Sequence, residues 1–409
     1  MVRALVIPLV LATWTVCVGA GMATTTADAH RQAELLDTSR APSRVQRTLF
    51  AAGVHQDRGE MDQARALLRK FLADHPDLDH HLIRHQLGLL LAHADSLVAA
   101  REQLEAAVGL APDFQPAWRN LAEAAYGLGD FTTAATAFTR AVALDPVHLP
   151  ELRYYEAVAY LLGDRPDRSL ALMISLLDDH TAPDLAWHRV LLAAALGADR
   201  AADITTHMTI LTDDRPDDPE AWLLASRQAQ AMADYDRAVG ALTVTGYLRP
   251  LHRDELFLLG DLCAAADTPT RAARHYETAL AMDGSATGAE LDRLVAAYLA
   301  AFATDRALVT LDRRLALEPT AEAWRLKGEV LYGQDLFAAA LTAFDAAADM
   351  APHDARLDLL RGYCCLELEQ PDRAAGYLRA AMRDERWAAP AGAALEHLQR
   401  LDRLRQRGG

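Results

Sequence analysis

Apolar and small residues recur along the chain with a period of about 34 residues. Three segments with a tryptophan near their start show it directly: AWRNLAEAAYGLGDFTTAATAFTRAVALDP (117–146), AWLLASRQAQAMADYDRAVGALTVTGYLRP (221–250) and AWRLKGEVLYGQDLFAAALTAFDAAADMAP (323–352). In each, apolar residues fall at helical spacing, a short turn follows, and a second helical stretch ends before a proline. The turn contains Gly129-Asp130 in the first segment and Ala233-Asp234 in the second. Each segment therefore predicts a pair of antiparallel helices.

Five positions of the repeat hold the same kind of residue in these copies. Tryptophan stands at the fourth position, a small residue at the eighth, alanine at the twentieth, a large apolar residue at the twenty-fourth and proline at the thirty-second. The residues with these structural roles are Trp118, Trp187, Trp222, Trp324, Gly88, Gly260, Gly328, Ala134, Ala238, Ala340, Pro146, Pro250 and Pro352. A small residue opposite an alanine lets two helix backbones approach closely. Proline ends the second helix, because it lacks an N–H group and clashes with the preceding turn.

The same register predicts ten units, which start near residues 45, 81, 115, 149, 184, 219, 253, 288, 321 and 355. Alanine is missing from the twentieth position only in units four and five, where Arg168 and Asp203 stand instead. These two units also lack the closing proline, so the array is predicted to be degenerate at about 149–218.

The spaced pattern resembles that of the tetratricopeptide repeat (TPR) superfamily. The resemblance implies an all-α fold, a right-handed solenoid of about ten helical hairpins that occupies 45–388. Residues 389–409 are predicted to form a capping helix and tail, with Leu395, Leu398 and Leu401 at helical spacing. A polar-backed terminal helix of this kind covers the hydrophobic end of a repeat array.

In the TPR superfamily the first helix of each unit lines a concave groove through the second, fifth, ninth, twelfth and thirteenth positions. The resemblance therefore implies a groove that binds a protein or peptide partner. Arginine and tyrosine, which often anchor interfaces, are frequent at these positions. The implied groove residues are His85, His93, Arg119, Glu123, Tyr126, Arg153, Tyr160, His188, Arg227, Gln230, Arg325, Glu329 and Tyr332. For each charged residue the alternative is an ordinary solvated helix face.

The N-terminus has the order of a secretory signal. Arg3 precedes an apolar run, and small residues follow. Residues 1–29 are predicted to be a signal peptide with an uncertain cleavage site, the alternative being an uncleaved N-terminal anchor, and 30–44 a flexible lead-in. Under both interpretations the protein lies in the periplasm. It is attached to the membrane only if the N-terminal segment is an uncleaved anchor.

The net charge argues against one class of partner, and the number of cysteines argues against a fold held together by disulfides. The 409 residues carry a formal net charge of −16, which disfavours binding to nucleic acid. Cys263, Cys364 and Cys365 are too few for a disulfide framework. The adjacent Cys364 and Cys365 are either buried small residues or a strained redox-active pair.

No sequence motif for catalysis or nucleotide binding is present, including GxxxxGK[ST], GxSxG and HExxH. The array leaves no room for a catalytic domain, so we expect no enzyme, no catalytic residue and no cofactor. Five histidines do gather between 75 and 93, and His81 and His85 have a spacing that can hold zinc or copper. A metal- or haem-handling protein is thus the alternative from another functional class, although no complete metal site is predicted.

The segment GYLRPLHRDELFLLGDLCAAADTPTRAARHYETALAMD (246–283) has a more particular resemblance. It resembles periplasmic TPR proteins that accompany TonB–ExbB–ExbD systems of Gram-negative bacteria. The matching residues are Trp222, Gly246, Leu248, Leu256, Leu259, Leu262, Pro269, Ala272 and Ala273. The resemblance implies a non-catalytic periplasmic scaffold for TonB-dependent energy transduction and uptake. The alternative envelope machinery is exopolysaccharide export or outer-membrane assembly.

Overall fold

The fold is entirely helical over the residues that the computed structural model describes, which are 38–144, 149–181, 183–282 and 285–408. These ranges contain the α-helices α3 to α23, three short 3-10 helices and no strand. The prediction of an all-α repeat fold is therefore confirmed. The predicted signal peptide 1–29, residues 30–37 of the lead-in and Pro146 lie outside the described residues.

The chain divides into two compact units, Met1–Asp234 and Tyr235–Gly409, and each is described by itself. The helices of the first unit are η1 (Thr38–Arg40), α3 (Ser43–Asp57), α4 (Met61–Asp74), η2 (Pro76–Leu78), α5 (His81–Ala92), α6 (Leu97–Leu110), α7 (Gln115–Gly127), α8 (Phe131–Ala143), α9 (Pro150–Leu162), α10 (Pro166–Asp178), α11 (Leu185–Gly197), η3 (Ala201–Ile204), α12 (Thr205–Asp214) and α13 (Pro219–Ala231).

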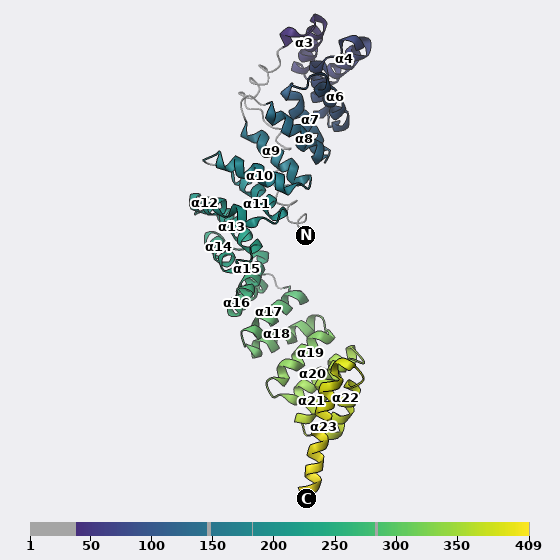
Figure 1. The fold of residues 1–409 in the computed structure, drawn as a ribbon, viewed down its shortest axis with the longest axis vertical. Helices are drawn as coiled ribbons and strands as arrows, with labels where there is room; N and C mark the ends of the chain where they lie inside the picture. The colour runs from purple at the N-terminus through teal and green to yellow at the C-terminus, as the bar shows by residue number, and fades with distance from the viewer. Residues whose placement is uncertain (1–37, 145–148, 182, 283–284, 409) are drawn as a thin grey trace. The chain divides into compact units, whose positions relative to one another are not determined.

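The helices of the second unit are α14 (Tyr235–Leu248), α15 (Arg253–Ala265), α16 (Pro269–Met282), α17 (Gly288–Ala300), α18 (Thr304–Leu317), α19 (Ala321–Tyr332), α20 (Phe337–Met350), α21 (Ala355–Glu367), α22 (Pro371–Ala381) and α23 (Glu385–Gly408). Within each unit, helices that follow one another in the chain pack as hairpins, and each hairpin stacks on the next (Figure 1). The core consequently runs along each stack, from Val45 to Leu224 in the first unit.

Tight packing within the hairpins occurs where the sequence places its small residues. A Cβ atom added to Gly260 would lie 2.3 Å from the Tyr276 ring, and one added to Gly328 would lie 2.5 Å from the Phe344 ring. Both rings belong to the second helix of the same hairpin, at the twenty-fourth repeat position. The small residue therefore makes room for the large one across the hairpin.

The turn inside each hairpin has a residue with positive φ. Most of these residues are glycine or a short polar residue, such as Gly129 at 75° and Asp164 at 64°. The carboxylate of the next residue can then cap the second helix, as Asp130 does by accepting from the Thr133 N–H at 3.1 Å. The Gly-Asp signal in the sequence thus encodes both the turn and the start of a helix.

Tryptophan side chains pack against the core, and two of them also form a hydrogen bond to the loop between successive hairpins. The Trp118 Nε1–H donates to the Pro112 carbonyl at 2.9 Å, and the Trp222 Nε1–H donates to the Pro216 carbonyl at the same distance. Both acceptors lie six residues earlier, in the loop that leads into the helix. Trp187 instead stacks on Tyr154, with 6.1 Å between ring centroids.

The segment 149–218 forms a regular hairpin followed by an irregular one. Helices α9 and α10 pack directly against each other. In the next repeat, the 3-10 turn η3 precedes α12, which has 10 residues. The final helix α23 begins at Glu385, four residues before the boundary expected from the sequence, and contains Pro390.

Candidate protein-binding surface

In the first unit, two arginines of the expected groove lie on neighbouring first helices. On α7, the Arg119 Nε–H donates to Glu123 at 3.1 Å. On α9, Arg153 reaches the second helix of its own hairpin, donating to Asp179 at 2.7 Å and to the Ser175 hydroxyl at 2.8 Å. Both guanidinium groups are thus held in position, yet their side chains retain partial exposure.

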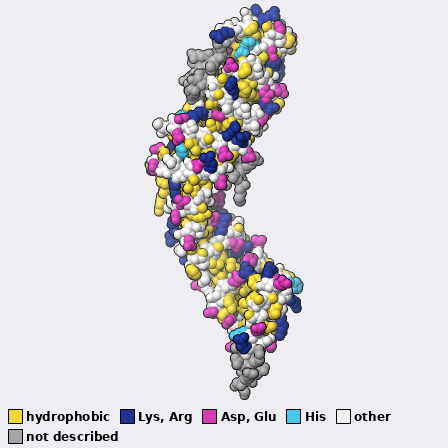
Figure 2. Space-filling model, in the orientation of Figure 1, with side chains coloured by type: hydrophobic (Ala, Val, Ile, Leu, Met, Phe, Trp, Pro, Cys, Tyr) yellow, Lys and Arg dark blue, Asp and Glu magenta, His cyan; other side chains and the backbone are white. Residues whose placement is uncertain are grey.

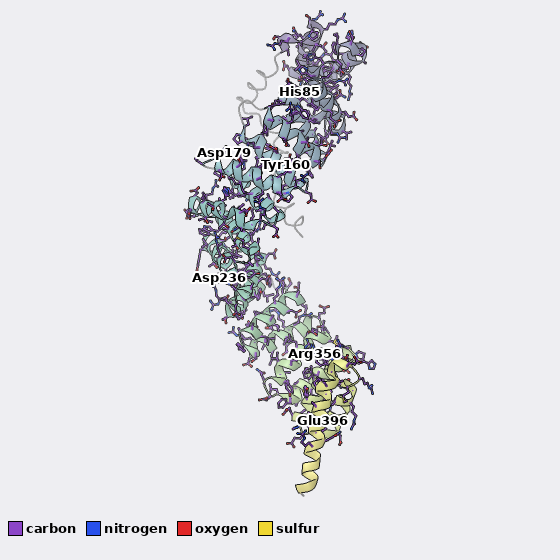
Figure 3. All side chains as sticks on the ribbon, in the orientation of Figure 1. His85, Tyr160, Asp179, Asp236, Arg356 and Glu396 are labelled. Atoms are coloured by element: carbon purple, nitrogen blue, oxygen red, sulfur yellow. The ribbon has the colours of Figure 1, made fainter. Side chains whose placement is uncertain are left out.

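Tyr160 belongs to a polar cluster at the other end of the α9–α10 hairpin from Asp179 (Figure 3). Its hydroxyl lies 2.9 Å from the Thr139 hydroxyl and accepts from Arg168 at 3.2 Å. The Thr139 hydroxyl also donates to Glu156 at 2.7 Å, and burial raises the pKa of that carboxyl. The cluster joins α8, α9 and α10.

The remaining residues expected in the first unit differ in their access to solvent. His85, Tyr126 and His188 are buried, whereas His93 and Gln230 are exposed. Arg227 is half-buried. Buried side chains cannot contact a partner in this conformation, so the accessible part of the surface consists mainly of the arginines, Glu123, Tyr160, His93 and Gln230.

In the second unit, a charged network lies on the first helices of the last two hairpins. Arg325 on α19 lies between Glu322 and Glu329, and it donates to Glu329 at 2.5 Å. Glu329 also accepts from Arg356, the second residue of α21, at 2.9 Å. Tyr332 is half-buried one turn further along α19 and packs edge-on against Phe337 at 5.2 Å.

Arg356 and Trp387 extend this network, and the sequence did not point to them. The Arg356 guanidinium lies 6.0 Å from the centre of the Trp387 ring, which α23 supplies, and its side chain is 43% exposed. Arg356 stands at the second repeat position of its unit, so the family rule for groove positions could have identified it. Trp387 has no such signal, since it precedes the predicted capping helix. Figure 3 shows Arg356 beside the start of α23.

The arrangement of these groups favours recognition by ion pairs and stacking. Arginine and carboxylate alternate in these networks, and Glu123, Asp179, Glu322 and Glu329 each accept from an arginine. Within the described ranges, no group of three or more histidine, cysteine, aspartate or glutamate side chains is placed to hold a metal ion. On the face shown in Figure 2, basic and acidic side chains are interspersed.

The histidines between 75 and 93 pack on aromatic rings. The rings of His81 and His85 both meet Phe114 edge-on, at centroid distances of 5.0 and 5.2 Å. His85 also lies 2.7 Å from the Asn120 amide nitrogen, and burial lowers the pKa of His85 to about 4. The pair that had metal-ligand spacing therefore contributes to the packing between α5 and α7.

The cysteines are buried thiols in the described structure. Cys364 and Cys365 are both free and lie on α21. Burial raises the pKa of Cys364 to about 12, so its thiol is protonated at neutral pH.

No helix among the described residues has the length and apolar character needed to cross a membrane.

Comparison with known families identifies the repeat. Two sequence profiles described as tetratricopeptide repeat match the chain, one over 51–113, 296–355 and 326–390 and the other over 115–146. No curated protein matches the chain.

Several solved structures show distant similarity. A tetratricopeptide repeat protein from Parabacteroides merdae is 15% identical, with 61% of this chain and 96% of that chain covered and a TM-score of 0.37. PilW, a type IV pilus biogenesis factor, is 19% identical over 49% of this chain and 92% of its own, with a TM-score of 0.36. Yeast Tom70 is 13% identical over 89% and 98%, with a TM-score of 0.34. Similarities of this size do not assign a partner.

Proposed function

We propose, from the premise that this chain contains tetratricopeptide repeats, that it is a non-catalytic scaffold that binds protein partners along the first helices of its hairpins. The observation that carries the proposal is the network of Arg325, Glu329 and Arg356 beside Trp387. Arginine and tryptophan are the residues most enriched among interface hot spots. Here ion pairs hold the arginines in place before a partner arrives, which reduces the entropy lost on binding.

The partner is proposed to belong to the machinery of the cell envelope. The order of charged, apolar and small residues in 1–29 supports export to the periplasm. The resemblance of 246–283 to TonB-associated periplasmic proteins supports an accessory role in TonB-dependent energy transduction and uptake. The alternative within the same class is a scaffold for exopolysaccharide export or outer-membrane assembly.

Capture from cross-linked cell envelopes tests the scaffold and its partner together. The tagged wild-type chain is compared with an Arg356→Glu, Trp387→Ala variant and with a control, Arg69→Ala, which removes an exposed arginine from α4. We expect the groove variant to lose at least about 80% of its enriched partners, since hot-spot losses of a few kcal/mol reduce affinity more than tenfold. The control should retain them.

The identity of the captured proteins separates the finer proposals. Enrichment of TonB, ExbB, ExbD or their receptors supports the energy-transduction role, and enrichment of export or barrel-assembly proteins replaces it with the alternative. If the groove variant captures the same proteins as the wild type in the same amounts, the proposed binding surface is refuted. A phosphatase reporter fused after residue 44 tests export separately, because it is active only outside the cytoplasm.

A further inference from the structure

The repeat register continues upstream of the first hairpin. In hairpins of both compact units the second helix ends two residues before a closing proline; these prolines are Pro76, Pro112, Pro250, Pro319 and Pro352. Pro42 stands one period of 34 residues before Pro76. The 3-10 helix η1 ends at Arg40, again two residues before the proline, and 3-10 turns are frequent at the ends of α-helices. The chain before Pro42 therefore has the register of a second helix.

The residues upstream of Pro42 differ in polarity from the second helix of a complete hairpin. In most hairpins the twentieth and twenty-fourth positions face the first helix of the same hairpin and are apolar, as Ala340 and Phe344 are. The corresponding residues here are His30 and Glu34. Polar residues at these positions indicate that this side of the segment faces water instead of a first helix.

The twenty-fifth position, in contrast, faces the next hairpin. Side chains at this position form hydrogen bonds with the first helix that follows: Thr139 with Glu156, Asp312 with Lys327 and Asp345 with Arg361. Lys327 and Arg361 stand at the seventh position of their repeats. In the upstream segment the twenty-fifth position is Leu35, and the seventh position of α3 is Ala51. An apolar residue is thus placed to meet an apolar residue of α3.

The seventh position of α3 lacks the cover that it has in other hairpins. Ala51 is half-buried, and among the described residues only η1 precedes α3. In later hairpins the same position is fully buried at Leu87, Leu121, Val190, Ala225, Leu259 and Leu294. The difference is expected for a helix at the end of a stack, where no neighbour packs on the outer face.

Phe50 shows that a preceding first helix is also missing. It stands at the sixth position, whose side chain can reach the first helix of the preceding hairpin. Gln86 and Asn120 do so through hydrogen bonds with Gln56 and His85. Phe50 is 76% exposed, so no such helix covers it within the described structure.

The chain just before α3 already lies against it. The Gln46 amide donates to the Ala41 carbonyl at 2.8 Å and to the Ser39 carbonyl at 3.2 Å, and Ala41 is buried. Ala51 lies about 7.5 Å further along the axis of α3 than Gln46, at 1.5 Å per residue. Leu35 comes six residues before Ala41, or about 9 Å in a helix. A helix antiparallel to α3 therefore brings Leu35 to the level of Ala51.

We infer that residues 30–40 pack on α3 as the second helix of an incomplete hairpin, with Leu35 against Ala51. This helix takes the place of the flexible lead-in expected at 30–44. It covers the open face of the first hairpin, as α23 covers the last one by packing on α21 and α22. The inference goes beyond the proposed scaffold function and does not depend on it.

Thiol labelling of the full chain by a maleimide tests the inference. Every protein carries Cys17→Ser, and the native thiols Cys263, Cys364 and Cys365 are buried. We expect Ala51→Cys to react at least about tenfold faster when Leu35→Glu is added, because a carboxylate cannot be buried against α3 and the cover is released.

Three matched variants locate the contact. Leu36→Glu makes the same change at the next residue, which the register places toward solvent, and should leave Ala51→Cys protected. Phe50→Cys should react as fast as Val98→Cys, whose site on α6 is exposed, with or without Leu35→Glu. If circular dichroism shows that Leu35→Glu unfolds part of the chain, Leu35→Ser makes the same comparison with a smaller perturbation.

Several results would overturn the inference. One is equal reactivity of Ala51→Cys with and without the change at Leu35, and another is an equal effect of Leu36→Glu. Protection of Phe50→Cys would show that a complete hairpin or a second copy covers this end, and protection that falls on dilution would identify the second copy. Protection lost in a chain that begins at residue 30 would assign the cover to 1–29. Partner capture by the Arg356 and Trp387 surface is measured separately, so the scaffold function can stand or fail independently.

Discussion

Small residues set the distance between the two helices of a hairpin, and Gly260 shows how narrow the tolerance is. The Tyr276 ring occupies the space where a Cβ atom of residue 260 would lie. The Tyr276 hydroxyl donates to Asp261 at 2.6 Å, so the ring cannot move away without breaking that hydrogen bond. The glycine is therefore required by the close approach of the two helices.

Replacing Gly260 with alanine should destabilise the second unit by about 1–3 kcal/mol, the usual cost of overpacking a core. The control is Gly376→Ala on the exposed face of α22, where an added Cβ atom meets nothing within 4 Å. That change should instead stabilise the helix by roughly 0.5–1 kcal/mol. Urea denaturation of the three proteins measures both effects, and a Gly260→Ala variant as stable as the wild type would refute the packing argument.

His85 makes the stability of the first unit depend on pH. The ring is 2% exposed, its Nε2 lies beside Asn120, and its Nδ1 has no hydrogen-bond partner within the described structure. Burial, with a smaller contribution from His81, lowers the pKa of His85 from its ordinary value of about 6.5 to about 4. The folded state thus holds the neutral form, and the unfolded state binds a proton first as pH falls.

We therefore expect stability to be unaffected by His85 above about pH 6.5 and to fall between pH 6.5 and 4, by at most about 3 kcal/mol. His85→Gln should lose less stability over that interval, even if it starts lower at pH 7. His93→Gln, at an exposed position, should keep the wild-type pH dependence. Thermal denaturation at half-unit steps of pH makes the comparison, and parallel curves for wild type and His85→Gln would contradict it.

At the scale of helices, ion pairs join one hairpin to the next. Arg253 at the start of α15 donates to both carboxylate oxygens of Glu290 near the start of α17, at 2.5 and 2.8 Å. The Arg253 hydrogen bonds lower the pKa of Glu290 to about 2, and the Thr287 N–H adds a further bond to the same carboxylate. Stability from this pair is present above the unfolded pKa of glutamate and is lost as pH falls toward 2.

Glu290→Gln should lower stability at pH 7 by about 1–2 kcal/mol, as expected for a charge-assisted pair with limited exposure. The difference from the wild type should shrink below pH 4 and vanish near pH 2, because the wild-type carboxyl then also becomes neutral. Glu277→Gln, whose longer ion pair to Arg306 is largely exposed, should change stability by less than about 1 kcal/mol. A Glu290→Gln deficit that persists at pH 2 would show that the carboxylate charge is not the cause.

At the scale of the array, the last hairpin depends on the helix that covers it. Helix α23 packs on both α21 and α22 and contributes the buried residues Ala391 and Leu398. Opposite these lie Leu359 and Leu378, which would become accessible without α23. An end repeat without its cover exposes the same apolar surface that neighbours bury inside the array.

Removing residues 385–409 should consequently lower the stability of the second unit by roughly 3 kcal/mol or more, the worth of one or two buried leucines. It should also promote aggregation. Removing only 402–409 is the matched control, since it leaves Ala391 and Leu398 in place. Denaturation midpoints and light scattering report both effects, and equal behaviour of the two truncations would exclude a covering role for α23.

The fold could be predicted from the sequence because a repeat array is encoded locally. Each hairpin needs a small residue opposite a large one, a turn residue that tolerates positive φ and a helix stop, and all three occur within one period. Gly328 facing Phe344 and Gly129 in its turn follow from that pattern. Helix α23 begins at Glu385, before the capping helix expected at 389–409, and Pro390 stands at its sixth position.

The binding surface was less predictable, because the repeat position alone does not decide exposure. His85 and Arg119 both stand at the fifth position, but His85 is enclosed by Phe114 and Asn120 whereas Arg119 remains partly open. Trp387 comes beside Arg356 only because α23 folds back on α21, a contact with no periodic signal. Exposure and pairing depend on neighbours from other repeats, so only packing determines them.

The helices, their pairing into hairpins and the residues at the close contacts could be predicted from the order of amino acids, because those interactions lie within one period of the chain. Packing between hairpins determines which charged side chains are held in networks and which histidines are buried. Phe302 in the turn before α18 and Val309 on α18 also remain exposed. These properties arise where successive hairpins stack, and stacking is a sum of contacts between residues far apart in sequence.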